Sequence, residues 1–148
     1  MIDGVVISPL KVISDERGKV MHMLRSDQSV FKKFGEVYFS TIFHNAIKAW
    51  HLHKEATLNY TCVSGEVKLV LFDDRAGSNT LGQFQEIILT PKKHKLITIP
   101  NNIWNGFLGI DKNESIIANC LDLPHNENEM VRKSPHDKLF NYKWSIKN

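Results

Sequence analysis

Two histidines separated by one residue are the part of the sequence best suited to acid–base chemistry. His51 and His53 lie in the run Lys48-Ala49-Trp50-His51-Leu52-His53-Lys54-Glu55. Alternate side chains of a β-strand point to one face, so both imidazoles would face the same side. Imidazole titrates near neutral pH, and a nearby lysine supplies positive charge. We predict proton transfer by His51 and His53 with Lys48 beside them; the alternative is that they are surface or hydrogen-bonded core histidines.

Short apolar segments separated by turn residues predict an all-β chain around these histidines. Ten segments are rich in Val, Ile, Leu, Thr or aromatic residues, over residues 5–8, 19–25, 36–43, 47–53, 59–63, 66–73, 84–89, 95–99, 106–110 and 115–121. Ser64-Gly65 predicts a tight hairpin, and one or two short helices are expected over Ser29–Phe34 and Pro135–Phe140. Strands without long helices must close or stack on themselves, which predicts a jelly-roll barrel or sandwich with a ligand site at its mouth.

Composition limits the classes of protein that fit. With 148 residues, 42% of them hydrophobic, we expect one domain over residues 1–148. The balance of 19 basic and 16 acidic residues is scattered, so no nucleic-acid partner is expected. No apolar run reaches the length of a membrane span, and no signal peptide is evident. Cys62 and Cys120 lie in apolar runs, which predicts buried thiols and a cytoplasmic location.

Motifs along most of the chain resemble those of one family of sugar-nucleotide enzymes. They are Asp15-Glu16-Arg17-Gly18, Val63–Val67 followed by residues 74–82, Ile99-Pro100 with Asn105-Gly106-Phe107, Pro124–Glu129, and Asp137–Trp144. In this order they resemble the dTDP-4-dehydrorhamnose 3,5-epimerases, which are cupins. The run from His51 to Lys54 is also similar to 3,4-ketoisomerases of thymidine-linked sugars. The resemblance implies a cupin-type jelly-roll fold, a homodimer and no cofactor.

The resemblance also implies a reaction and a catalytic set. His51 occupies the place of the family's catalytic base, and Asp137 that of the aspartate that orients the base. The family's lysine falls on Leu58, and its tyrosine acid falls near residues 122–124, where no tyrosine stands. We therefore expect an epimerase or ketoisomerase acting on a nucleotide-linked 4-keto-6-deoxy sugar in surface-polysaccharide synthesis. Lys48 or His53 would stabilise the enolate.

Further residues are candidates for binding the substrate or replacing the missing acid. The predicted substrate-binding residues are Arg17, Trp50, Asn59, Tyr60, Arg75, Trp104 and Asn105. The two tryptophans would stack on the nucleotide, and the two arginines would contact its pyrophosphate. Tyr38 and Tyr60 would serve as acids if they face the cavity. The alternatives are core packing for the aromatic residues and ion pairs with neighbouring acids for Arg17 and Arg75.

Two other functions compete with the enzyme hypothesis. Metal-dependent cupins bind their ion through two histidines, a glutamate and a third histidine. Here Leu58 and Asn105 stand at the last two places, so no metal is expected. A non-catalytic module that binds a sugar nucleotide is the other alternative, because the family lysine and tyrosine are missing.

Overall fold

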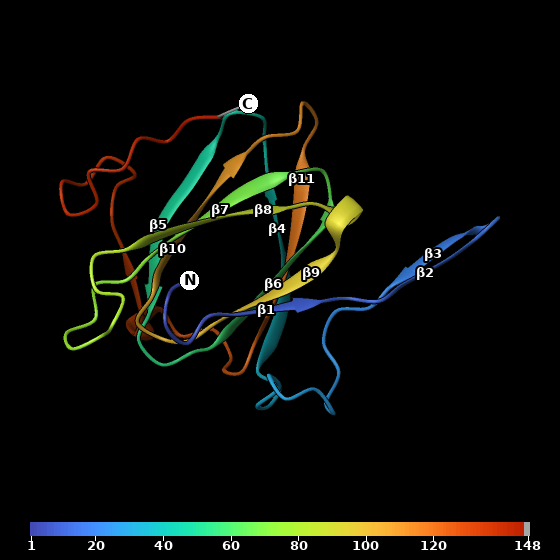
Figure 1. The fold of residues 1–148 in the computed structure, drawn as a ribbon, viewed down its shortest axis with the longest axis horizontal. Coiled ribbons are helices and arrows are strands. Elements are labelled where there is room, and N and C mark those ends of the chain that lie inside the picture. Colours follow the sequence, from blue (N-terminus) through green and yellow to red (C-terminus); the bar gives the residue numbers. More distant parts are fainter. Residues whose placement is uncertain (147–148) are drawn as a thin grey trace.

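The computed structural model describes residues 1–146, and two five-stranded antiparallel sheets form its body (Figure 1). The first sheet has the order β1 (Val6–Pro9), β9 (Lys95–Ile99), β6 (Leu58–Ser64), β11 (Ser115–Leu121), β4 (Glu36–Ile42). The second has the order β12 (Met130–Arg132), β5 (Ile47–His53), β10 (Trp104–Gly109), β7 (Val67–Phe72), β8 (Phe84–Leu89). This arrangement confirms the all-β, cupin-type prediction.

The strands formed by β-branched and aromatic residues agree closely with their predicted bounds. Four of them, β5, β8, β9 and β11, match residue for residue. The short strands β2 (Val12–Asp15) and β12 were not predicted, and β3 (Gly18–Met21) ends four residues before the predicted end at Arg25. The predicted hairpin at Ser64-Gly65 is wrong, because β6 and β7 belong to different sheets. Gly65 has a φ of +81° and lies so close to Ser115 that a Cβ would stand 2.2 Å from the Ser115 hydroxyl.

The helices predicted over Ser29–Phe34 and Pro135–Phe140 are also wrong. The first segment begins in a turn and continues as irregular chain. The second forms turns, in which the backbone amide of Phe140 donates to the carbonyl of Asp137 at 3.2 Å, a three-residue spacing. Within residues 1–146, the helical elements are two single 3-10 turns, Pro91–Lys93 and Glu127–Glu129.

Apolar side chains cover both faces of the second sheet. Its inner face packs against the first sheet, and β7 is buried along its whole length. Its outer face carries Trp50, whose ring stacks on Phe140 with centroids 4.3 Å apart. Tyr142 and Trp144 pack against the same patch, so the C-terminal segment covers the outer face. This packing explains why β7 is apolar on both faces.

A two-stranded hairpin extends away from the body (Figure 1). It consists of β2 (Val12–Asp15) and β3 (Gly18–Met21), which pair only with each other. Ile13 is 48% exposed and Val20 is 59% exposed. The hairpin therefore presents apolar side chains that nothing in residues 1–146 covers.

Candidate active site

An open cavity of about 520 Å³ lies between the two sheets. The first sheet contributes Tyr38, Ser40 and Tyr60 to its wall, and the second sheet contributes the remaining strand residues. The lining residues are Tyr38, Ser40, Ile47, Lys48, Ala49, His51, His53, Tyr60, Phe107, Met130, Arg132 and Pro135. The cavity wall thus carries two histidines and two tyrosines, which are residue types able to transfer protons, and two basic residues, Lys48 and Arg132.

The two histidines share one wall of the cavity, as the alternation of β5 predicts. Burial lowers the pKa of His51 below its usual 6.5, and the charge of Arg132 and the neighbouring His53 lower it further. An imidazole with a lowered pKa is neutral at pH 7, which is the form that accepts a proton. His51 is therefore suited to act as a base.

The carboxylate partner in this site belongs to His53. Nδ1 of His53 is in hydrogen-bond contact with Oε1 of Glu129, and the two side chains are 7% and 8% exposed. Burial raises the pKa of Glu129, but hydrogen bonds from His53 and from the amides of Glu55 and Ala56 outweigh it, so the net direction is down. Sequence analysis did not single out Glu129, although its motif was identified.

The predicted contact between His51 and Asp137 is not found. The Asp137 carboxylate lies 3.7 Å from Nζ of Lys133 and accepts a hydrogen bond of 2.9 Å from the amide of Leu139. Within residues 1–146, no hydrogen bond or ion pair joins His51 to Asp137. The physical reason is that Phe140 and the aromatic residues after it hold this segment on the outer face of the sheet.

Two tyrosines face the histidines from the first sheet, and their hydroxyl groups are used differently. The Tyr38 hydroxyl oxygen accepts a hydrogen bond of 3.0 Å from the side-chain Nδ2 of Asn119, so the Tyr38 hydroxyl proton remains available to the cavity. Tyr60 donates its proton to Oδ1 of Asn105 at 3.1 Å. Burial raises the pKa of both tyrosines, so both are protonated at neutral pH. Tyr38 is therefore the better proton donor.

Lys48 and Arg132 place positive charge at the cavity. Arg132 on β12 is paired in register with His51 on β5, and its side chain is exposed. Nζ of Lys48 donates to the hydroxyl of Ser40 at 3.3 Å. An anionic ligand or a developing oxyanion would be attracted to this wall.

Of the seven predicted binding residues, only Tyr60 lines the cavity, and four of the other six are buried elsewhere. Trp50 is fully buried on the outer face, so the expectation that it flanks the mouth is wrong. Trp104 is 4% exposed in the same cluster, where its indole donates to Asp74 at 3.0 Å. Asn59 and Asn105 are buried, and both side chains are used in internal hydrogen bonds. Asn105 nevertheless supports the site, because it links Tyr60 to the carbonyl of His51.

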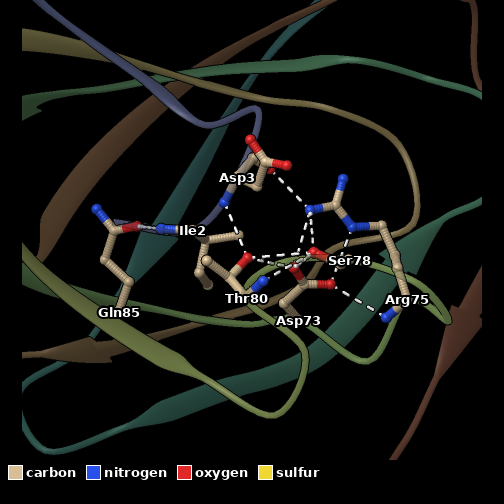
Figure 2. Close-up of polar contacts among 7 residues, drawn as sticks. All are labelled: Ile2, Asp3, Asp73, Arg75, Ser78, Thr80 and Gln85. Atoms are coloured by element: carbon tan, nitrogen blue, oxygen red, sulfur yellow. Dashed lines mark hydrogen bonds and ion pairs between the residues drawn. The ribbon is translucent and has the colours of Figure 1, made fainter.

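Arg75 is held in an internal cluster that ties the N-terminus to the loop before β8 (Figure 2). Its guanidinium donates to both oxygens of Asp73, at 2.9 and 2.8 Å, and to the carbonyl of Asp3 at 2.7 Å. The hydroxyls of Ser78 and Thr80 each donate to Asp73 at 2.6 Å. This geometry favours the structural alternative for Arg75.

Arg17 also lies away from the cavity. It is on the projecting hairpin, where its guanidinium donates to Asp15 at 2.7 Å and its side chain is 82% exposed. Arg17 can contact a sugar nucleotide in a cavity of this kind only if the hairpin lies against a second molecule.

Replacing Asp73 with Asn should lower the free energy of unfolding at pH 7 by about 3 kcal/mol, because a buried ionic network loses its central charge. Hydrogen bonds from Arg75, Ser78 and Thr80 hold the pKa of Asp73 well below its usual range despite burial. The ionised Asp73 carboxylate therefore contributes fully to the free energy of unfolding above about pH 4, the pKa of an aspartate in the unfolded chain. This contribution is lost as the pH falls below that value. Urea unfolding at pH 7 and at about pH 3 should show a smaller difference at the lower pH.

The control for this variant is Asp27→Asn, which removes an exposed ion pair with Arg25 and should leave stability nearly unchanged. An equal loss from Asp73→Asn at both pH values would contradict the account of the cluster.

The residues at the cavity do not fit the metal site of metal-dependent cupins. Leu58 is a core residue, 1% exposed. The Asn105 side chain is hydrogen-bonded to the hydroxyl of Tyr60 and the carbonyl of His51. Among residues 1–146, no group of three or more His, Cys, Asp and Glu side chains is arranged to hold a metal ion. Over the same residues, no helix is long and apolar enough to cross a membrane.

Comparison with known proteins decides the family. A family model described as dTDP-4-dehydrorhamnose 3,5-epimerase matches residues 1–148. The chain belongs to this family. The family predicted from the motifs is therefore confirmed, and the family consists of sugar epimerases of the isomerase class.

Three relatives of the dTDP-4-dehydrorhamnose 3,5-epimerase family illustrate the similarity. A dTDP sugar isomerase from Desulfovibrio desulfuricans is 36% identical, with a TM-score of 0.89 over 94% of this chain and 88% of that one. The probable low-salt glycan biosynthesis epimerase Agl13 of Haloferax volcanii is 29% identical over 80% of this chain and 77% of its own. The spore coat polysaccharide biosynthesis protein SpsL of Bacillus subtilis is 25% identical over 98% and 97%.

Proposed function

We propose that this chain is an isomerase that epimerises a nucleotide-linked 4-keto-6-deoxy sugar at a carbon beside the ketone. The observation that carries the proposal is the placement of proton-transfer groups on opposite walls of one cavity. His51 comes from the second sheet, and Tyr38 comes from the first. A sugar ring between the sheets would have a base on one face and a proton donor on the other. This arrangement supports epimerisation, in which the proton leaves one face and another returns to the opposite face.

The first step is removal of a proton by His51. The ketone acidifies the neighbouring C–H bond, and the lowered pKa keeps His51 neutral and able to accept the proton. The electron pair of the broken bond moves to the ketone oxygen and forms an enolate. Lys48 and Arg132 place positive charge on the same wall, and this charge stabilises the developing oxyanion.

The second step is return of a proton to the opposite face. Tyr38 supplies it, because the side-chain Nδ2 of Asn119 donates to the phenolic oxygen and leaves the O–H free. The ketone forms again with inverted configuration at its neighbour. The tyrosinate of Tyr38 then takes up a proton from water and the imidazolium of His51 releases one to water, which restores both groups. The Tyr38 hydroxyl thereby replaces the tyrosine acid that the sequence lacks near residues 122–124.

We propose further that Lys48 and Arg132 attract the pyrophosphate of the nucleotide and that the chain forms a homodimer. The exposed hairpin supports the dimer, because its apolar residues Ile13 and Val20 are exposed and its strands pair only with each other. Its Arg17 is 82% exposed and is paired with Asp15 of the same hairpin. In a dimer the hairpin of one copy would reach the other, and Arg17 could then contact the nucleotide. Light scattering should give twice the chain mass; the mass of one chain would contradict the dimer.

The proposed location is the cytoplasm, and the proposed pathway is the synthesis of a glycan or polysaccharide. Cys62 and Cys120 are buried free thiols, and burial raises the pKa of Cys62 to about 11, which suits a reducing compartment. The printed names of Agl13 and SpsL support the pathway. Recovery of the native protein outside the cytoplasm after cell fractionation would contradict the location.

The function is tested by incubating the protein with a panel of nucleotide-linked 4-keto-6-deoxy sugars and analysing the products by NMR. We expect one panel member to yield a product inverted at a carbon beside the ketone. Binding of a nucleotide sugar without any new product across the panel would instead favour a non-catalytic binding module.

A further inference from the structure

The contact between His53 and Glu129 is one of the most deeply buried polar contacts at the cavity. The two side chains are 7% and 8% exposed, and Oε1 of Glu129 contacts Nδ1 of His53. Oε2 of Glu129 accepts hydrogen bonds from the amides of Glu55, at 3.1 Å, and Ala56, at 3.4 Å. Both carboxylate oxygens therefore have fixed partners, and the carboxylate cannot rotate freely.

This contact determines which nitrogen of His53 carries the proton. An ionised carboxylate only accepts hydrogen bonds, so Nδ1 must be the donor. A neutral imidazole has one proton, which leaves a lone pair on Nε2. Within residues 1–146, Nε2 of His53 has no hydrogen-bond partner, while the side chain lines the cavity.

We propose that Glu129 is a positioning residue that fixes His53 as a hydrogen-bond acceptor of the cavity, through Nε2. The inference deepens the proposed function and rests on it. His51 takes the proton from carbon, and Nε2 of His53 accepts a hydrogen bond from a sugar hydroxyl beside the reacting centre. No covalent bond changes at His53; the hydrogen bond holds the sugar so that its acidic C–H bond faces His51.

The register of β12 explains how Glu129 reaches His53. Met130 pairs with His53 and Arg132 pairs with His51, so one short strand places a group beside each histidine. The 3-10 turn Glu127–Glu129 ends at this strand and delivers the carboxylate. Residues 127–132 therefore place a side chain beside each of the two histidines, although they are distant from β5 in sequence.

The test is the substitution Glu129→Gln, read by ¹⁵N NMR of the His53 ring and by turnover. The side-chain carbonyl of the introduced Gln can still accept hydrogen bonds from the backbone amides of Glu55 and Ala56. Its NH2 group, however, can only donate to Nδ1 of His53, so the ring proton moves to Nε2. We expect the neutral His53 ring of the wild type to carry its proton on Nδ1. The variant should carry it on Nε2, and kcat/KM should fall about 10²-fold because the sugar is no longer held in position.

Two further variants serve as controls. Glu127→Gln changes an exposed acid of the same 3-10 turn that does not line the cavity, and it should leave the tautomer and kcat/KM unchanged. Glu129→Asp keeps a carboxylate and should keep the proton on Nδ1. A wild-type ring protonated on Nε2, or a tautomer unaffected by Glu129→Gln, would overturn the proposal. The NMR readout needs no substrate, so it tests the inference even if no sugar nucleotide is turned over and the proposed function fails.

Discussion

Replacing His51 with Asn should lower kcat/KM by about 10³-fold or more, since the base that opens the reaction is lost. Asn cannot accept the proton from carbon, and the other groups of the cavity do not occupy the position of His51. Steady-state kinetics with the substrate identified from the panel would measure the loss. In the wild type, kcat/KM should fall on the acid side with a pKa below 6.5, because burial and Arg132 hold the pKa of His51 below that value.

The control for His51→Asn is His44→Asn, which changes an exposed histidine in the turn between β4 and β5 that does not line the cavity. His44→Asn should retain full activity. Calorimetry should show that His51→Asn still binds the nucleotide, because the cations Lys48 and Arg132 remain. A His51→Asn variant with more than about a tenth of wild-type activity would contradict the role of His51 as the base.

Replacing Tyr38 with Phe should lower formation of the epimerised product by about 10²-fold, yet leave exchange of the C–H proton with solvent. His51 remains in place and still removes the proton, but the opposite face loses its donor. The measurement compares two rates in deuterated water: incorporation of deuterium into recovered substrate and appearance of product. In the variant, the first rate should exceed the second by a much larger factor than in the wild type.

Tyr60→Phe is the matched control for Tyr38→Phe, because both tyrosines lie in the same wall and lose the same atom. The Tyr60 hydroxyl already donates to Asn105, so its loss should cost less than tenfold and should not separate exchange from product formation. Equal losses of exchange and product in Tyr38→Phe would indicate that Tyr38 acts in binding and does not return the proton.

The strands were predictable where a run of apolar residues is bounded on both sides by turn residues. The segments of β5, β8, β9 and β11 are bounded by turn residues and rich in apolar side chains, and their ends fell where predicted. The C-terminal segment was not predictable in this way. Tyr142 packs on Trp144, but most partners of the segment's aromatic residues lie on the folded outer face around Trp50, which is distant in sequence. Because the segment packs on the outer face, Asp137 lies away from the cavity.

The candidate site was predictable only for groups that are close together in sequence. Strand alternation placed His51 and His53 on one face, and it also implies that Trp50 between them points away, as the structure has it. Glu129 lies 76 positions from His53 in a turn, so no local pattern joins the two. Tyr38 depended likewise on how β4 faces β5 across the cavity.

Mass spectrometry of the product formed in deuterated water tests the central claim most directly. The protein is incubated with the nucleotide-linked 4-keto-6-deoxy sugars, and the sugar mass is followed while NMR locates the label. We predict one deuterium at an inverted carbon beside the ketone, and none with His51→Asn. Product formed at the normal rate by His51→Asn, or an inverted product without solvent deuterium, would contradict proton transfer between the two walls.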